Sequence, residues 1–168
     1  MSTVWLIDTS VYLNVLDIPG KNQACETVLN AFATGKDAGD RYLLPMATIW
    51  ESGNHISRLP DGNQRRTYAS RLVEDVAEAL AGRAPYVPTY FPDRETFLLW
   101  LRAFPDAASR NKSADKTREG VSLADLSLIK EWEQTCARNP LRRVCIWSLD
   151  SDLAAYDRAQ PMHATRSR

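Results

Sequence analysis

The sequence predicts an α/β protein, a three-layer α/β/α sandwich built on a parallel sheet of about four or five strands. Two observations lead to this fold class. Short apolar runs at residues 4–7, 42–45 and 143–149 have the length and composition of buried strands. Longer segments with apolar residues at helical spacing separate these runs, as in βαβ units with right-handed crossovers. The 168 residues suit one domain, which we place at residues 1–160.

In the first half of the chain, turn residues separate the predicted elements. The first strand stops at Asp8, and an amphipathic helical pattern follows until Pro19 and Gly20, which are typical of a helix end. A polar break at 35–40 and a turn at 59–62 mark two further boundaries. In order, we expect a strand at 4–7, a helix ending near residue 16, a helix at 23–34, a strand at 42–45, and helices at 48–58 and 64–81.

The second half begins with a proline-rich stretch and ends in a polar tail. Pro85, Pro88 and Pro92 interrupt residues 83–92, which are therefore a loop or an edge segment of the sheet. Residues 105–120 are polar and charge-rich, and we expect a flexible surface loop there, with a helical end piece as the alternative. The remaining expected elements are helices at 94–104 and 122–137, a strand at 143–149, a final helix at 152–159 and a tail at 161–168.

Charge and composition exclude several classes of protein. Lysine plus arginine and aspartate plus glutamate each number 21, which excludes a uniformly basic surface but not a local basic patch. No apolar run approaches the roughly 20 residues that cross a bilayer, and the first residues lack the features of a signal peptide. Cys25, Cys136 and Cys145 form no C-x-x-C motif, so we expect reduced thiols in a cytoplasmic protein with no membrane association.

Four acidic residues stand where an α/β sheet gathers its ligands: Asp8, Glu51, Asp125 and Asp150. Asp8 and Asp150 follow strand-like runs, whereas Glu51 and Asp125 lie in helical segments. In an open α/β sheet, the carboxyl ends of the strands and the neighbouring helices meet at one crevice. Ionised carboxylates gathered there repel one another and are costly to bury unless a divalent cation compensates their charge. The pattern therefore predicts metal-assisted attack on a phosphodiester.

Helix capping is the structural alternative for the two acids in helical segments. Thr48-x-x-Glu51 and Ser122-x-x-Asp125 both have the spacing of a capping box, in which the acid satisfies backbone donors. Asp125 lies among apolar residues, so we expect it to be buried and partnered, either by the cap or by a metal.

Capping also competes for the two acids that follow strands. Asp8 would be the N-cap of the first helix, although Thr9 and Ser10 can take that role instead. Near the end of the chain, Asp152 suits the N-cap of the last helix better than Asp150 does. We therefore expect Asp150 to point freely into the crevice.

Taken together, these acids and their neighbours resemble the PIN-domain nucleases, in particular the VapC-type toxins of bacterial toxin–antitoxin systems. That family has an aspartate after the first strand, a glutamate on a central helix, an alanine–aspartate pair opening a late helix, and a Ser/Thr-x-Asp-x-Asp ending a late strand. The corresponding pieces here are Ile7-Asp8-Thr9-Ser10-Val11, Trp50-Glu51, Leu123-Ala124-Asp125 and Ser148-Leu149-Asp150-Ser151-Asp152-Leu153. The resemblance covers essentially the whole chain.

The resemblance implies an Mg²⁺- or Mn²⁺-dependent endoribonuclease that hydrolyses RNA phosphodiester bonds. Magnesium prefers oxygen ligands, so Asp8 and Asp125 would be direct metal ligands. Asp150 and Glu51 would bind through water or at a second metal. Ser10, Ser148 and Asp152 would orient these carboxylates. The resemblance also implies a small antitoxin protein as partner and a homodimer.

One segment departs from a minimal PIN toxin. The chain is somewhat longer than a minimal PIN toxin, and the additional length lies in the segment 83–120. This segment carries Arg110, Lys112, Lys116 and Arg118. These side chains belong either to a solvated loop or to a strip that contacts substrate phosphates.

Several other functions remain as alternatives or are disfavoured. A non-catalytic PIN-fold module that binds RNA or protein, and a stand-alone RNA-processing or defence nuclease, both fit the same residues. A haloacid-dehalogenase-like phosphatase needs Asp-x-Asp after the first strand, which is absent. His55 and His163 are the only histidines, which disfavours a His-pair ribonuclease or a zinc site. Trp50 either packs in the core or stacks on bases, and we expect the core.

Overall fold

The computed structural model describes residues 2–159, which form a five-stranded sheet with the order β3-β2-β1-β4-β5. The predicted tail at 161–168 lies outside these residues. The strands β3, β2, β1 and β4 are parallel, and β5 runs antiparallel to β4. The elements in chain order are β1 (Val4–Ile7), α1 (Thr9–Val15), α2 (Cys25–Asp37), β2 (Arg41–Leu44), α3 (Met46–Ser57), α4 (Gly62–Leu80), β3 (Tyr86–Pro88), α5 (Arg94–Ser109), α6 (Leu123–Arg138), β4 (Val144–Trp147), α7 (Ser151–Ala154) and β5 (Asp157–Arg158).

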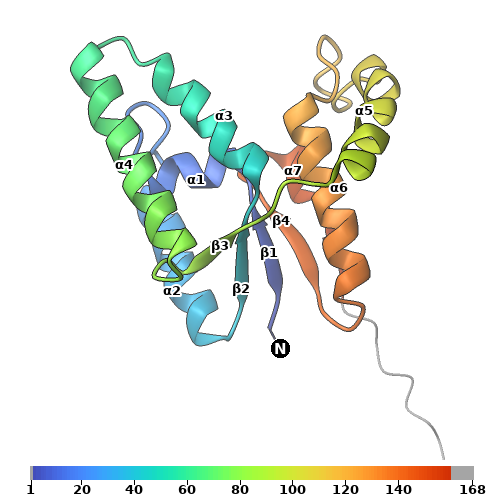
Figure 1. Cartoon of the computed structure of the whole chain (residues 1–168), viewed down its shortest axis with the longest axis horizontal. Helices are drawn as coiled ribbons and strands as arrows, with labels where there is room; N and C mark the ends of the chain where they lie inside the picture. The colour runs from blue at the N-terminus through green and yellow to red at the C-terminus, as the bar shows by residue number, and fades with distance from the viewer. Residues whose placement is uncertain (1, 160–168) are drawn as a thin grey trace, which may run out of the picture.

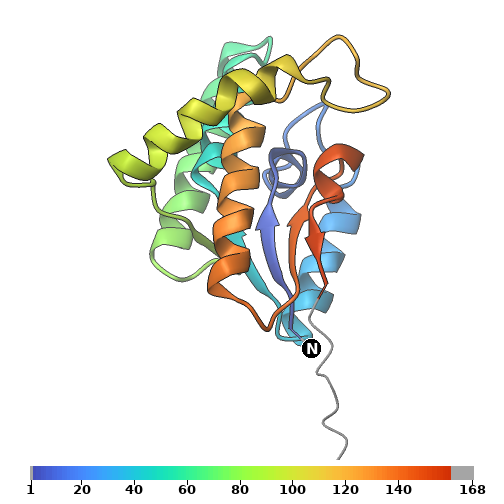
Figure 2. The same cartoon turned by 90° about the vertical axis from the view of Figure 1, so that its right-hand side faces the viewer.

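Helices cover both faces of the sheet, which confirms the predicted three-layer α/β/α sandwich (Figures 1 and 2). The side chains of β1 alternate between the two faces, as the period of a strand requires. Val4 and Leu6 pack with the apolar residues of α6 and α7, whereas Ile7 packs with those of α1 to α4. The central strand is therefore buried on both sides, which explains its continuous apolar sequence.

Helix α4 is attached to the sheet through one shared carboxylate. Its Asp75 accepts hydrogen bonds from the hydroxyls of Tyr12 on α1 and Tyr86 on β3, at 2.6 and 2.7 Å. Burial and this carboxylate raise the pKa of both tyrosines. The hydrogen bonds hold a helix whose surface is otherwise largely exposed.

The end of the chain differs from the prediction. A final helix at 152–159 was expected, but α7 stops at Ala154 and the chain turns into the short strand β5. The cause is the free edge of β4, where the amide of Ile146 bonds to the carbonyl of Tyr156 at 3.0 Å. Arg158 then donates to three carbonyls at the C-terminal end of α6 and beyond, which fixes the strand in place. The sheet is therefore mixed at this edge.

Residues 83–120 contain more regular secondary structure than we expected. The proline-rich stretch includes β3, which is an edge strand of the sheet, and this was one of the two predicted alternatives. Helix α5 continues through Pro105 to Ser109, so the start of the predicted loop is helical. None of the helices in the stretch from residue 2 to 159 is long and apolar enough to span a membrane.

The segment after α5 is a loop closed at its base, which we call the lysine loop (residues 110–120). Asn111 and Gly120 form an isolated antiparallel bridge, and the amide of Lys112 bonds to the carbonyl of Glu119 at 2.9 Å. A Cβ atom at Gly120 would lie 2.0 Å from the carbonyl oxygen of Ala108, so no other residue fits without moving α5. Glycine therefore allows the two ends of the loop to meet.

Candidate active site: an acidic cleft at the carboxyl edge of the sheet

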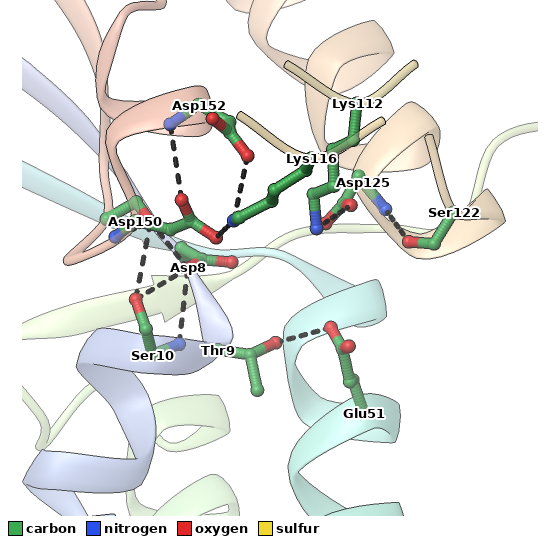
Figure 3. Close-up of polar contacts among 11 residues, drawn as sticks. Asp8, Thr9, Ser10, Glu51, Lys112, Lys116, Ser122, Asp125, Asp150 and Asp152 are labelled. Carbon is green, nitrogen blue, oxygen red and sulfur yellow. Dashed lines mark hydrogen bonds and ion pairs between the residues drawn. The ribbon is translucent and has the colours of Figure 1, made fainter. Parts of the chain in front are cut away.

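All four predicted acids line a single cleft at the carboxyl ends of β1 and β4, which we call the acidic cleft. Asp8 begins α1, Glu51 comes from α3, Asp125 from the first turn of α6, and Asp150 from the turn after β4 (Figure 3). The cleft is lined by Asp8, Thr9, Ser10, Leu13, Lys21, Glu51, His55, Lys112, Asp125, Asp150 and Leu153.

Asp8 is held by neutral donors. It is the N-cap of α1 and is 6% exposed, and its Oδ2 accepts from the amide and hydroxyl of Ser10 at 3.2 and 2.7 Å. The hydroxyl of Ser148 donates to the same oxygen at 2.8 Å. Between residues 2 and 159, every hydrogen bond to this carboxylate goes to Oδ2. Capping and site chemistry are therefore compatible at Asp8, because Oδ1 is left for a ligand.

The two serines also connect the ends of β1 and β4. The hydroxyl of Ser10 accepts from the amide of Leu149, and that of Ser148 accepts from the amide of Asp150, both at 2.9 Å. Each serine thus contacts Asp8 and also fixes the turn that carries Asp150. The structure places Ser10 and Ser148 where they can orient both acids.

Glu51 does not belong to a capping box. Helix α3 begins at Met46, so Thr48 lies inside it, buried, and donates to the carbonyl of Ile7 at 2.8 Å. The capping interpretation of Thr48-x-x-Glu51 is therefore wrong. Glu51 instead accepts from the hydroxyl of Thr9 at 2.8 Å, across the cleft from α3 (Figure 3).

Asp125 combines a cap with an ion pair. Ser122 is the N-cap of α6, and its hydroxyl accepts from the amide of Asp125 at 3.0 Å. The Asp125 carboxylate, only 7% exposed as a residue, lies with Oδ2 at 2.9 Å from Nζ of Lys112. Apart from this ion pair, Oδ2 has no hydrogen-bond donor in the stretch that the structure describes. Half of the predicted capping box is present, and the acid itself faces the cleft.

The roles predicted for Asp150 and Asp152 are exchanged in part. Asp150, not Asp152, is the N-cap of α7, and its Oδ1 accepts from the Asp152 amide at 3.3 Å. The reason is that α7 starts at Ser151, one residue earlier than expected. Oδ2 of Asp150 still lies at 2.6 Å from Nζ of Lys116, and Oδ2 of Asp152 at 2.9 Å from the same ammonium group. Figure 3 shows Lys116 lying between these two carboxylates.

The lysine loop therefore supplies the positive charge of the cleft. The hydrogen bonds to Asp150 and Asp152 raise the pKa of Lys116, and the same contact lowers the pKa of Asp150. Burial, which lowers the pKa of Lys112, is outweighed by the Asp125 carboxylate, so its pKa is raised overall. The cations replace, in this arrangement, the charge compensation that we expected from a metal.

Two of the four basic residues expected to bind substrate lie away from the acids. Arg110 and Arg118 are exposed and make no ion pair between residues 2 and 159, whereas Lys112 and Lys116 contact the acids directly. The prediction of a solvated loop is thus wrong for the two lysines. Nothing in the sequence indicates which of the four basic residues turns inward.

Sequence reasoning missed two cationic or titratable residues of the cleft, Lys21 and His55. His55 lies four residues after Glu51 on α3, and this spacing puts both on one helix face. Burial lowers the pKa of His55, with Glu51 opposing the shift and Lys21 adding to it. The spacing of four residues between Glu51 and His55 therefore indicates from the sequence that His55 lies near the site.

The donor set of the cleft suits a hard divalent cation. Asp8, Glu51, Asp125 and Asp150 offer only oxygen ligands, which Mg²⁺ and Mn²⁺ prefer. With the lysines in place, no three acidic, histidine or cysteine side chains in residues 2–159 are gathered closely enough to hold one ion. The residues fit the metal in chemistry and in burial, and they would hold it once the ammonium groups leave Asp125 and Asp150.

An apolar hollow lies directly beside the acidic cleft, and we call it the aromatic groove. Glu51 lines both. Trp50 is 64% exposed in it, so the expectation that Trp50 packs in the core is wrong. Its main apolar walls are Trp50, Phe91, Phe97, Trp100, Leu123 and Ala124.

The architecture and the position of the acids define the PIN-like α/β fold, and comparison with solved structures confirms it. The crystal structure of FitAcB from Neisseria gonorrhoeae and the structure of FitAB bound to an IR36 DNA fragment both share the fold. Each matches 90% of this chain with a TM-score of 0.52 and 16% sequence identity. The match covers 91% of the FitAcB chain and 89% of the FitAB chain. At this identity the likeness establishes the fold alone. No protein-family model matches the sequence, and no curated protein matches it.

Proposed function

We propose that this protein is a metal-dependent endoribonuclease that hydrolyses RNA phosphodiester bonds and acts as the toxin of a toxin–antitoxin pair in the cytoplasm. The observation that carries the proposal is the acidic cleft. Four carboxylates from distant parts of the sequence converge there, in a fold shared with FitAcB. Conventional capping accounts for some of their hydrogen bonds but not for their gathering at one edge of the sheet.

Asp8, Asp125 and Asp150 would hold Mg²⁺ or Mn²⁺ through their carboxylate oxygens. The bound ion would lower the pKa of a water molecule and neutralise charge on the attacked phosphate. Ser10 and Ser148 keep Asp8 oriented, with Oδ2 occupied by their hydrogen bonds. Glu51, whose carboxylate accepts a hydrogen bond from Thr9, would accept the proton of the attacking water.

The lysine loop takes on a second role when substrate binds. Lys112 and Lys116 would leave the carboxylates and contact the phosphate backbone, since ammonium groups are strong phosphate partners. Arg110 and Arg118 would extend this strip along the exposed side of the loop. Asp152, which shares Lys116 with Asp150, would hold the lysine near the cleft during the exchange.

Cleavage of a mixed RNA pool by purified protein tests the enzyme. We expect cutting with Mg²⁺ or Mn²⁺, no cutting with EDTA, and a loss of roughly 100-fold or more in Asp8→Asn and Asp125→Asn. Asparagine is as good an N-cap as aspartate, so Asp8→Asn should keep its unfolding midpoint. Asp61→Asn, at the exposed N-cap of α4, is the matched control and should cleave like wild type. Equal cleavage by the two site variants and wild type would refute the assignment.

The toxin role has its own test. We propose that a small antitoxin protein is the partner of this chain. Induced expression in a bacterial host should arrest growth, and Asp8→Asn should relieve the arrest. Normal growth with active wild-type enzyme would favour a stand-alone RNA-processing or defence nuclease.

We also propose that the protein is a homodimer. Helix α5 exposes Leu98, Leu99 and Leu101, at 47%, 62% and 36%, an apolar surface that a second copy can cover. Light scattering should give twice the chain mass for wild type and the chain mass for Leu99→Glu. A wild-type monomer at micromolar concentration would rule out this dimer.

A non-catalytic RNA-binding module is the second candidate. The ion pairs of Lys112 and Lys116 favour it, because they already compensate the acids that a metal would otherwise need to neutralise. RNA binding without metal-dependent cleavage, together with no metal binding by calorimetry, would identify this function.

A further inference from the structure

We propose that the aromatic groove binds an unpaired nucleobase next to the scissile phosphate, so that the substrate is single-stranded at the cleavage site. The inference rests on the proposed function and names the substrate class of that same site. Its ligand is a neutral, flat, aromatic group, and the phosphate attached to that nucleoside occupies the acidic cleft.

Trp50 is the first observation. It lies on α3 directly before Glu51, yet 64% of it is exposed, far more than is usual for a tryptophan. Phe91 contacts it edge-to-face, with ring centroids 5.8 Å apart and planes at 86°. This contact supports the indole from one side and leaves much of its surface open. Such a ring is a stacking platform for a base.

The second observation is that the groove and the cleft are continuous. Glu51 lines both, and Ala124 of the groove precedes Asp125 of the cleft. A phosphodiester placed among the carboxylates therefore has one of its two flanking nucleosides at the mouth of the groove.

The third observation is the division of charge. The groove is lined by two acids, Glu51 and Glu131, and by no lysine or arginine, so it repels rather than attracts a phosphate, whereas the cleft is lined by Lys21 and Lys112. The groove, at about 510 Å³, has the size of a small-ligand pocket. Asn54 and Ser127 offer hydrogen-bonding groups at its walls, suited to the edge of a base. Phosphates thus belong to the cleft and bases to the groove.

A base can enter the groove only when it is neither paired nor stacked on its neighbours. A continuous duplex would hold both flanking bases within the helix, away from Trp50. The groove therefore selects single-stranded RNA, and base stacking of this kind is tolerant of sequence.

Binding of a short labelled RNA, followed by fluorescence anisotropy, tests the inference. The Asp8→Asn background keeps the RNA intact. Trp50→Leu should weaken binding of single-stranded RNA about ten-fold, and Trp50→Phe, which keeps an aromatic face, less than about three-fold. Tyr90→Leu, at a tyrosine 93% exposed that does not line the groove, is the matched control and should bind unchanged. A duplex of the same sequence should bind at least about ten-fold more weakly than the single strand.

Tryptophan emission gives a second readout that structural damage would not imitate. RNA should quench the emission of wild type, and Trp50→Phe should lose most of that quenching while its circular dichroism stays the same; Trp100, which also lines the groove, accounts for the remainder. Quenching that is undiminished without Trp50 would overturn the inference.

The outcomes separate this inference from the proposed function. Trp50-dependent RNA binding without metal-dependent cleavage removes the nuclease and keeps the stacking site. Cleavage with equal RNA affinity in Trp50→Leu removes the stacking site, keeps the nuclease, and assigns the groove to a protein partner. If neither wild type nor Trp50→Leu binds RNA, both the proposed nuclease and the stacking site are wrong.

Discussion

The acidic cleft and the aromatic groove share Glu51 but differ in how they handle charge. In the cleft, three of the acids have close partners: serine hydroxyls for Asp8 and lysines for Asp125 and Asp150. In the groove, burial raises the pKa of Glu131 to about 7, because it outweighs the opposing effects of Thr89 and Arg138. Burial thus raises the pKa of the Glu131 carboxyl, whereas the hydrogen bond from Lys116 lowers the pKa of Asp150.

The difference explains how two adjoining surfaces can take opposite parts of one nucleotide. In the cleft, Lys112 and Lys116 of the lysine loop compensate the charge of Asp125 and Asp150. The groove reduces its charge, because burial makes ionisation of Glu131 costly. One surface suits phosphate and metal, the other suits an uncharged base.

The largest expected effect is at Glu131 and tests whether burial outweighs the contacts of the groove carboxyl with Thr89 and Arg138. A folded-state pKa of about 7, above the ordinary 4.5, means that the folded protein holds the proton more tightly than the unfolded chain. Stability is thus lost as pH rises from 4.5 to 7 and stays low above it. Glu131→Gln should be up to about 3 kcal/mol more stable than wild type at pH 8 and equal to it at pH 4.

Urea unfolding at several pH values measures this effect. Glu133→Gln, at a partly exposed acid paired with Lys130, is the matched control and should follow wild type within about 1 kcal/mol. Parallel curves for wild type and Glu131→Gln would show that Glu131 is compensated after all, and the contrast between the two regions would disappear.

The next effect is at Lys112 and tests whether the loop stands in for a metal. Lys112→Met leaves Asp125 buried without a cation and should lower the free energy of unfolding by about 2 kcal/mol in EDTA. Mg²⁺ should restore more stability to this variant than to wild type, since the ion replaces the lost charge. Urea denaturation with and without Mg²⁺ measures both.

Lys130→Met is the control for Lys112→Met, because its pair with Glu133 is partly exposed and should contribute less than about 1 kcal/mol. A stable Lys112→Met that ignores Mg²⁺ would mean that the lysine does not compensate Asp125.

The smallest effect concerns the serine hydroxyls that donate to Asp8 in the cleft. Ser148→Ala removes one hydrogen bond to Asp8 and leaves the amide of Asp150 without its acceptor. Cleavage should fall about ten-fold, and stability should fall by about 1 kcal/mol. Ser57→Ala, whose hydroxyl donates only to the exposed turn at Asn54, should change neither. Initial cleavage rates and urea midpoints make the comparison; an unchanged rate in Ser148→Ala would show that Asp8 needs no such support.

Local patterns were sufficient to predict the parallel part of the sheet, the order of the elements as far as β4, and the gathering of the acids. Asp8 and Asp150 could be placed because each follows a strand, and parallel strands present their carboxyl ends at the same edge. Glu51 and Asp125 could be placed because each opens or follows a recognisable helical pattern. These are short-range signals, and they do not depend on contacts between distant segments.

The contacts that the sequence could not predict are long-range. Lys116 meets Asp150 across 34 positions, and polar residues between two helices read equally well as a solvated loop. Part of the helix expected at 152–159 is replaced by strand β5, because pairing with the open edge of β4 is more favourable than continuing a helix of weak propensity. Trp50 was expected inside because tryptophans usually are, and only the position of Phe91 and α5 shows that it lines an open groove.

The bridge between Asn111 and Gly120 makes the lysine loop an interchangeable module. Because its two ends meet over the backbone of Ala108, residues between them can change in number and kind without altering the path of α5 or α6. Evolution could therefore exchange the charge offered to the acids while keeping the scaffold, and a protein engineer could do the same by grafting a neutral loop between these two residues.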